Sequence, residues 1–328
     1  MRSPGHHQLR SAVRKSCQLD CSTGQLSRRN FLHESLALGL SLTALVAPGQ
    51  AKERSSSARH SRVISLDNSL TQMALSVGVT PVGTPAPPRY RRFAVEPILP
   101  DDVIDIGADV SAPSLELLRA LKPDLILVNR GIAATAGDTL SLVAPLAVPS
   151  RGFQTLNGNP FEAAIEEHLA TSEALDRVRE GESYRDNVIT LLDSLSRRVR
   201  SVTSRPLLIL WSVDSRHSYV LVRNSIFQGA LDRLGLANAW QGVAMPLGMS
   251  VVGLEQIAPL EAATIVVIEG SGNVSETIAS PLWQALRPVR ERRVITLPPM
   301  WTVGGLPVAE RFARHLVPAL ERLEAGHG

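Results

Sequence analysis

Apolar and polar positions along the first part of the chain predict strands and helices in turn. Short apolar runs at 62–66 (RVISL), 79–82 and 124–128 (DLILV) have the length and composition of strands. Between them, 68–77 and 115–121 carry apolar residues at helical spacing, and each segment is followed by a helix-stop signal, Gly78 and Lys122-Pro123. This alternation predicts a parallel, doubly wound α/β lobe over residues 61–158.

The middle of the chain has a different pattern. Residues 161–200 contain no proline and one glycine, Gly181, and their apolar residues recur at helical spacing. One or two long helices are expected, with a possible break near 176–181, in a helical bridge over 159–202. Strands are then expected at 207–211, 219–222, 264–268 and 294–297, with helices at 225–234 and 308–323, in a second lobe over 203–328. The predicted fold class is α/β, two doubly wound lobes joined by a long helix.

The N-terminus has the features of an export signal. Arg28-Arg29-Asn30-Phe31-Leu32 precedes the apolar run Ser35–Ala47, which is typical of a twin-arginine (Tat) signal peptide. A run of thirteen residues is too short to span a bilayer, which takes about 20. We expect cleavage after Ala51, a signal peptide over 1–51, a disordered lead-in over 52–60, and a periplasmic product.

Composition limits the functions available to that product. The 328 residues carry a net charge of +3, but the first 51 hold six basic and two acidic side chains, which leaves −1 for the rest. A nearly neutral body argues against nucleic acid as a partner. Both cysteines, Cys17 and Cys21, lie in the signal. The exported protein therefore lacks disulfides, cysteine-ligated metals and thiol nucleophiles.

Motifs for catalysis are missing from the chain. There is no G-x-x-x-x-G-K-[ST], H-E-x-x-H or G-x-S-x-G sequence, and Gly270-x-Gly272 lacks the rest of a dinucleotide fingerprint. We therefore expect no enzyme activity, no cofactor and no protein-bound metal. The three tyrosines are too few to favour capture of bare Fe³⁺ by hard oxygen donors.

The aromatic residues point instead to ligand binding. They are expected at loops or strand ends (Tyr90, Phe93, Tyr219, Trp240 and Trp301), and in Pro88–Phe93 three arginines flank two rings. Rings at the ends of strands commonly line ligand crevices in α/β lobes. The sequence thus predicts a cleft lined with rings and cations.

Several segments, in their joint order over more than two hundred residues, give the chain a resemblance to a known family. The most specific are Asn224-Ser225-Ile226-Phe227-Gln228, Asn238-Ala239-Trp240-Gln241-Gly242 and Pro281-Leu282-Trp283-Gln284-Ala285-Leu286. The chain resembles the periplasmic iron(III)-siderophore-binding proteins of ABC importers, most closely the ferric-hydroxamate (FhuD) type. The resemblance implies a class III, helical-backbone fold, capture of a ferric siderophore between two lobes, and delivery by a monomer to an inner-membrane permease.

The resemblance also implies which residues form the site, and at several of these positions this chain differs from its relatives. Where relatives have a hydroxamate-binding arginine, this chain has Ala108-Asp109-Val110-Ser111, and their tyrosine falls at Ile132. The pocket positions fall at Phe93, Tyr219, Leu247 and Trp301, and only Trp301 keeps its ring type. We expect Arg130 or Arg91 to supply the missing cation and Tyr219 the missing phenol, and we expect Tyr90 to be a further ligand-binding residue. The acids that meet the permease fall at Asp138 and Glu255.

Other functions stay open at this point. One alternative is a binder of another chelate, such as a catecholate siderophore, haem or a cobalamin. A catecholate is more anionic and would require more clustered basic residues. A less favoured alternative is an exported enzyme on the same scaffold, such as a reductase or esterase, which the missing nucleophile motif argues against. A structural adaptor is disfavoured by the aromatic residues expected at the cleft.

Overall fold

The computed structural model describes residues 60–108, 112–149, 158–212, 217–243, 245–270 and 278–326. All of them belong to one compact unit, Arg54–Gly328. The predicted Tat signal, its cleavage site, both cysteines and nearly all of the expected lead-in lie outside the described residues.

The first lobe is built on a five-stranded parallel sheet with the order β3-β2-β1-β4-β5. Its strands are β1 (Val63–Ser65), β2 (Gly83–Thr84), β3 (Ile104–Asp105), β4 (Leu125–Leu127) and β5 (Leu146–Ala147). Its helices are α1 (Asn68–Ser76), α2 (Pro87–Phe93), α3 (Leu115–Ala120) and α4 (Arg130–Ser141). The strand expected at 79–82 begins only at Gly83, and α2 forms where a loop was expected.

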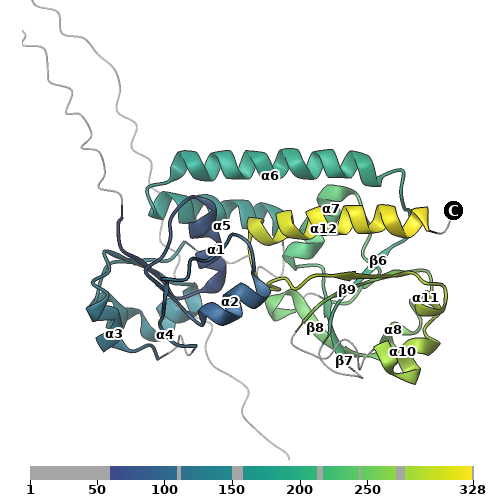
Figure 1. Cartoon of the computed structure of the whole chain (residues 1–328), viewed down its shortest axis with the longest axis horizontal. Coiled ribbons are helices and arrows are strands. Elements are labelled where there is room, and N and C mark those ends of the chain that lie inside the picture. Colours follow the sequence, from purple (N-terminus) through teal and green to yellow (C-terminus); the bar gives the residue numbers. More distant parts are fainter. Residues whose placement is uncertain are drawn as a thin grey trace, which may run out of the picture. The chain divides into compact units, whose positions relative to one another are not determined.

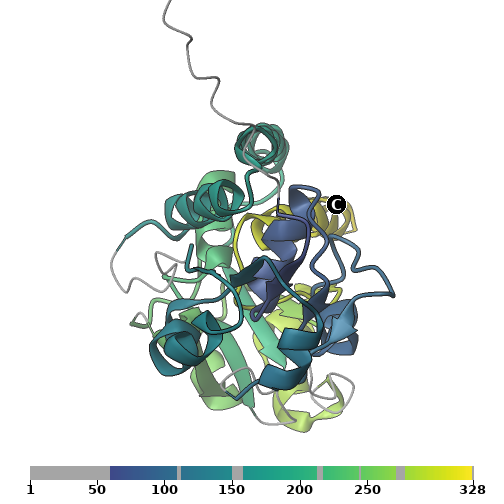
Figure 2. The same cartoon turned by 90° about the vertical axis from the view of Figure 1, so that its left-hand side faces the viewer.

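Two long helices follow, α5 (Pro160–Ala174) and α6 (Val178–Val199). The break falls at 175–177, at the start of the expected window. Gly181 does not interrupt the helix but lies inside α6, where an added Cβ would come within 2.2 Å of the Ser172 hydroxyl oxygen. Glycine therefore lets α5 and α6 pack closely, and α6 lies on the outer side of α5 in both views (Figures 1 and 2).

The second lobe contains a mixed sheet with the order β10-β9-β6-β7-β8. Its strands are β6 (Leu207–Ser212), β7 (His217–Leu221), β8 (Met249–Gly253), β9 (Thr264–Ile268) and β10 (Val294–Leu297). Its helices are α7 (Ile226–Leu234), the 3-10 turn Pro246–Gly248, α8 (Leu254–Ile257), α10 (Pro281–Ala285), α11 (Arg287–Arg290) and α12 (Leu306–Ala325). β6, β9 and β10 are parallel, whereas β7 and β8 pair antiparallel.

The predicted fold class is confirmed: two α/β lobes, each with a five-stranded sheet, are joined by long helices. The antiparallel pair β7–β8 is an addition that the strand-and-helix alternation did not reveal. α12 packs against α5 and α6 and runs parallel to α6, so the three helices cover the side of the unit shown uppermost in Figure 1. In the described part of the chain, no helix combines the length and apolarity needed to cross a bilayer.

One polar residue is buried deep in the helical layer. His168 on α5 is fully buried, and neither ring nitrogen has a hydrogen-bond partner among the described residues. Its ring lies 4.9 Å from that of Tyr184 on α6, whose hydroxyl donates to Glu310 on α12. Burial lowers the pKa of His168 to about 4, because the charged imidazolium would lose its hydration.

This burial predicts a stability that falls with acid. The unfolded chain protonates His168 below its ordinary pKa of about 6.5, whereas the folded chain resists protonation down to about 4. The free energy of unfolding should therefore drop by about 3 kcal/mol between pH 7 and pH 4 through this residue. Urea unfolding of H168F, which keeps a ring of similar size, should show a shallower pH dependence. An unchanged slope in H168F would contradict the assignment.

Candidate functional site

A cavity of about 390 Å³ lies between the two lobes. The first lobe contributes Arg89 and Phe93 from α2. The second lobe contributes Trp211 and Tyr219 from β6 and β7, Leu247 from the 3-10 turn, Met249 from the start of β8, and Met300, Trp301, Thr302 and Val303 from the loop after β10. Its volume lies in the range of small-molecule sites, about 300–1,000 Å³. No carboxylate is among these described lining residues.

Three aromatic rings form one wall of the cavity. Trp211 and Tyr219 are paired across β6 and β7, with ring centroids 5.6 Å apart. The Phe93 ring approaches Trp211 edge-on at 6.4 Å from the opposite lobe. The Trp211 indole nitrogen is buried and has no acceptor among the described residues. Because that nitrogen is covered, Trp211 offers the cavity its apolar ring rather than a donor.

Leu247 reaches the cavity from a strained turn. Its backbone is left-handed (φ 63°), a conformation that leucine rarely adopts, and its side chain is 49% exposed. The next residue, Gly248, is also left-handed, and an added Cβ would meet the Ser225 Cα at 2.8 Å. The close approach of this turn to the start of α7 thus turns an apolar side chain toward the space between the lobes. Strain of this kind is common at ligand sites.

Trp301 joins the lobes at the cavity. It follows β10, packs against the large core of the second lobe, and also packs against the small core around Tyr90, Ala94 and Leu99 of the first lobe. The guanidinium carbon of Arg89 lies 5.0 Å from its ring centroid. Trp301 therefore holds apolar contacts on both sides and a cation–π contact at the cavity.

Polar contacts fasten the lobes beside the cavity. The Ser69 hydroxyl on α1 donates to the Val303 carbonyl at 2.6 Å. Arg311 on α12, only 7% exposed in its side chain, pairs with Glu96 just after α2 at 2.9 Å. These two contacts fix α1 and the end of α2 against the second lobe, so the relative position of Phe93 and Trp301 is set on both sides.

Four of the predicted ligand residues come together in the cavity: Phe93, Tyr219, Leu247 and Trp301. They come from four separate segments, and their meeting agrees with the pocket positions that the resemblance implied.

Four other predicted ligand residues are not brought to the cavity. Tyr90 is fully buried on the core side of α2, and its hydroxyl donates to the Pro97 carbonyl at 2.8 Å. Burial raises the pKa of this hydroxyl. Arg91 donates to the Pro100 carbonyl at 2.8 Å and pairs with Asp101 at 3.3 Å.

Arg130 and Ile132 lie in the first turn of α4 and are not among the described lining residues. Arg130 is exposed there. Ile132 is 6% exposed and packs in the core of the first lobe, while its backbone N–H donates to the Asn129 cap. Neither of the arginines proposed from the sequence is among the described residues that line the cavity.

Among the lining residues, Arg89 and Trp211 were not expected from the sequence. A helical reading of 87–93 would have found Arg89, because it is four residues before Phe93 and so shares its face. Trp211 could have been found from its pairing with Tyr219, which lies directly opposite it on the neighbouring strand. Finding that pairing required the antiparallel arrangement of β6 and β7, which the alternation of strands and helices did not predict.

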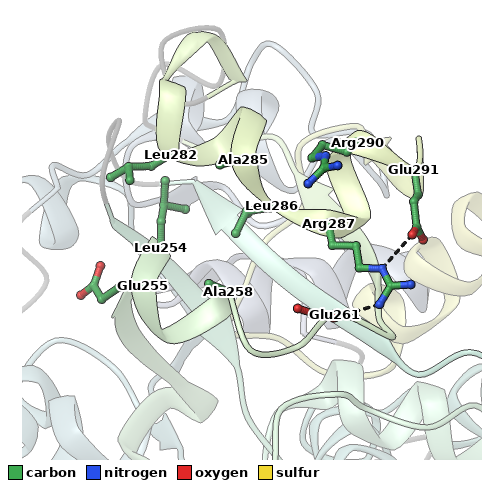
Figure 3. A pocket seen from close by; sticks show the side chains of 10 residues that line it. All are labelled: Leu254, Glu255, Ala258, Glu261, Leu282, Ala285, Leu286, Arg287, Arg290 and Glu291. Atoms are coloured by element: carbon green, nitrogen blue, oxygen red, sulfur yellow. Dashed lines mark hydrogen bonds and ion pairs between the residues drawn. The ribbon is translucent and has the colours of Figure 1, made fainter.

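A second, larger cavity of about 620 Å³ lies within the second lobe alone, between α8, α10 and α11 (Figure 3). Its floor is apolar (Leu254, Leu282 and Leu286). Arg287 is already paired there with Glu261 and Glu291, at 2.9 and 2.8 Å. We take the smaller cavity as the candidate site, because both lobes build it and it gathers the rings and a cation that a chelate requires.

The sequence profile of the periplasmic binding protein family matches residues 63–300, which include both sheets and most of the cavity lining. The chain belongs to the periplasmic binding protein family. Membership of a family of binding proteins confirms the expectation that the chain is not an enzyme.

Three relatives of this periplasmic binding protein are informative. It is 31% identical over 258 residues to the iron(3+)-hydroxamate-binding protein FhuD of Escherichia coli, covering 78% of this chain and 85% of the relative. It is 24% identical over 239 residues to the Fe(3+)-citrate-binding protein YfmC of Bacillus subtilis, covering 71% of each. The Fe³⁺–Desferal-bound siderophore-binding protein FhuD from Vibrio cholerae has the same fold, with a TM-score of 0.75, 24% identity, and coverage of 80% of this chain and 99% of that one.

The ion pair between the lobes gives a stability prediction. Replacing Glu96 with Gln leaves the buried Arg311 guanidinium without its carboxylate, which should lower the free energy of unfolding by about 1–3 kcal/mol. Chemical denaturation measures the change. E173Q, an exposed site on α5, is the matched control and should change stability by less than about 0.5 kcal/mol. Equal losses in both variants would show that the ion pair does not hold the lobes.

Proposed function

We propose that this periplasmic binding protein captures a ferric siderophore of the hydroxamate type in the cavity between its lobes, as the solute-binding component of an ABC importer. One observation carries the proposal: two lobes together form an apolar, ring-lined cavity whose described lining contains a single arginine, in a chain 31% identical to a hydroxamate-binding relative. The support from the structure is the edge-on contact between Phe93 of the first lobe and Trp211 of the second, with Tyr219 beside Trp211.

The chemistry of a ferric trihydroxamate fits such a cavity. Six ligand oxygens already saturate the iron, so the protein supplies no metal ligand and meets only the organic shell and the outer oxygen edges. Phe93, Trp211 and Trp301 offer apolar area for the shell, while Arg89, Tyr219 and Thr302 carry the hydrogen-bond donors of the lining. Apolar walls with a few placed donors are the usual composition of a small-molecule site.

Tryptophan fluorescence tests the proposal. A coloured iron chelate seated beside Trp211 and Trp301 should quench their emission on titration with a ferric trihydroxamate, and the quenching should saturate at one chelate per chain. W301F should lose much of this quenching. W283F is the matched control, because Trp283 is 2% exposed in the core of the second lobe and does not line the cavity.

Two results would reject the proposal. One is wild-type protein whose fluorescence ignores every ferric siderophore of a panel that includes hydroxamate, catecholate and citrate complexes. The other is saturable quenching that W301F retains in full while W283F loses it, because that pattern would place the chelate away from the cavity.

We further propose that the chain is exported by the twin-arginine route and acts in the periplasm as a monomer. The support is the order of Arg28-Arg29, the apolar run Ser35–Ala47 and the small residues before Lys52. Nucleic acid is not a partner in this proposal, since the part of the chain after the signal is nearly neutral.

Docking to a permease is assigned to one acid on each lobe. Asp138 is exposed on α4 of the first lobe and Glu255 is exposed on α8 of the second. Glu255 stands at the rim of the larger cavity, at the opposite end from the Arg287 ion pairs in Figure 3. Exposed carboxylates without a rigid local partner are suited to meet basic side chains of a membrane protein.

Charge reversal tests this docking. D138K together with E255K should reduce uptake of the iron chelate by whole cells at least tenfold, because like charges would then face the permease. Binding of the chelate in solution should stay within about twofold, since neither acid lines the cavity. The control E116K with E173K changes two other exposed acids. Full uptake by the D138K/E255K protein would contradict the assignment.

A further inference from the structure

Helix α2 presents Arg89 to the cavity and restricts its position. Arg89 and Phe93 share one face of the helix, and both line the cavity. The guanidinium lies over the Trp301 ring, at 5.0 Å from its centroid, so a residue of the second lobe orients a cation of the first. A guanidinium stacked on a ring keeps its N–H groups free at the edges of its plane, where they can donate to ligand oxygens.

The charge of Arg89 has no carboxylate partner among the described residues. On the same helix, Arg91 is paired with Asp101, and Arg92 stacks on Phe93 without lining the cavity. The described lining contains no other charged side chain. Among its described lining residues, the cavity therefore offers about one unit of positive charge, set among apolar rings.

This charge count discriminates between classes of chelate. Three hydroxamate groups neutralise a ferric ion, so a ferric trihydroxamate is uncharged apart from its substituents and presents polarised oxygen edges. Three catecholate groups leave the ferric complex triply negative. One guanidinium can donate to the oxygens of the trihydroxamate complex. It would leave most of the negative charge of the tris-catecholate complex uncompensated beside Phe93, Trp211 and Trp301, and burying an unpaired charge against apolar rings is costly.

We propose that Arg89 is the specificity-determining residue of the site. Its guanidinium, stacked on the Trp301 ring, donates hydrogen bonds to the ligand oxygens. As the cation of the described lining, Arg89 also sets a preference for ferric chelates of low net charge, the trihydroxamates. The inference rests on the proposed function, because it assigns the recognition of the same ligand to a residue outside the positions that the family resemblance implied.

Calorimetric titration of the full chain tests the inference with two probes, an uncharged ferric trihydroxamate and a ferric tris-catecholate. Replacing Arg89 with Gln should weaken trihydroxamate binding about 10- to 100-fold, the loss expected for a charge-assisted hydrogen bond. R89K, which keeps the charge without the planar stack, should fall between wild type and R89Q. R119Q removes an exposed arginine of α3 outside the lining and should stay within about twofold.

A gain-of-function variant tests the charge count itself. L247R adds a second cation to the exposed rim of the cavity and should raise the affinity for the tris-catecholate at least tenfold relative to the trihydroxamate. The gain should shrink as salt is raised, which a packing effect would not do. The unfolding temperatures of all variants should match that of wild type, so that lost binding cannot be ascribed to lost structure.

The outcomes separate this inference from the proposed function. If wild type binds the trihydroxamate and R89Q binds it equally well, Arg89 does not determine specificity, and the proposed function stands. A preference for the tris-catecholate in wild type would overturn the charge argument. If wild type binds no ferric siderophore at all, both the inference and the proposed function fail.

Discussion

The structure depends on one apolar contact, the packing of Trp301 between the two lobes. The ring touches the large core of the second lobe on one side and the small core around Tyr90 and Leu99 on the other, while Arg89 lies over its face. Aromatic side chains bury large areas and fix geometry well. Trp301 therefore contributes an apolar contact between the lobes, supplies a wall of the cavity, and orients the cation beside it.

Fastening at Trp301 limits how far the lobes can move. The Ser69–Val303 hydrogen bond and the Glu96–Arg311 ion pair lie beside the same loop and helix, and α5, α6 and α12 pack against one another as a continuous layer. Opening the cavity would break these contacts together, because Glu96 lies in the segment after α2 while Trp301 and Val303 lie in the segment after β10, and α2 and the segment after β10 both line the cavity. A site that is already formed before the ligand arrives loses little conformational entropy on binding.

The fold was largely predictable, because strand and helix periodicities are local signals. The long helices were predicted from forty consecutive residues, 161–200, that contain no proline and have apolar residues at helical spacing. The site was less predictable than the fold. The resemblance led to four residues that line the cavity, Phe93, Tyr219, Leu247 and Trp301. It did not show which face of a helix is occupied by the other four, Tyr90, Arg91, Arg130 and Ile132. Arg91 turns to Asp101 and Tyr90 to the core, whereas Arg89, a neighbour of both, faces the cavity. Which arginine of a cluster faces a ligand depends on helix phase and on partners distant in sequence.

The central claim is that a preformed iron chelate, rather than the metal itself, is what the cavity recognises. A crystal structure of the protein with a ferric trihydroxamate, with diffraction data collected at the iron absorption edge, tests it most directly. The account predicts one iron peak beside Phe93, Tyr219 and Trp301, six ligand oxygens around the metal, and no protein atom within the coordination distance of about 2.0–2.2 Å. An iron peak in the larger cavity of the second lobe, or a protein side chain bound to the iron, would contradict it.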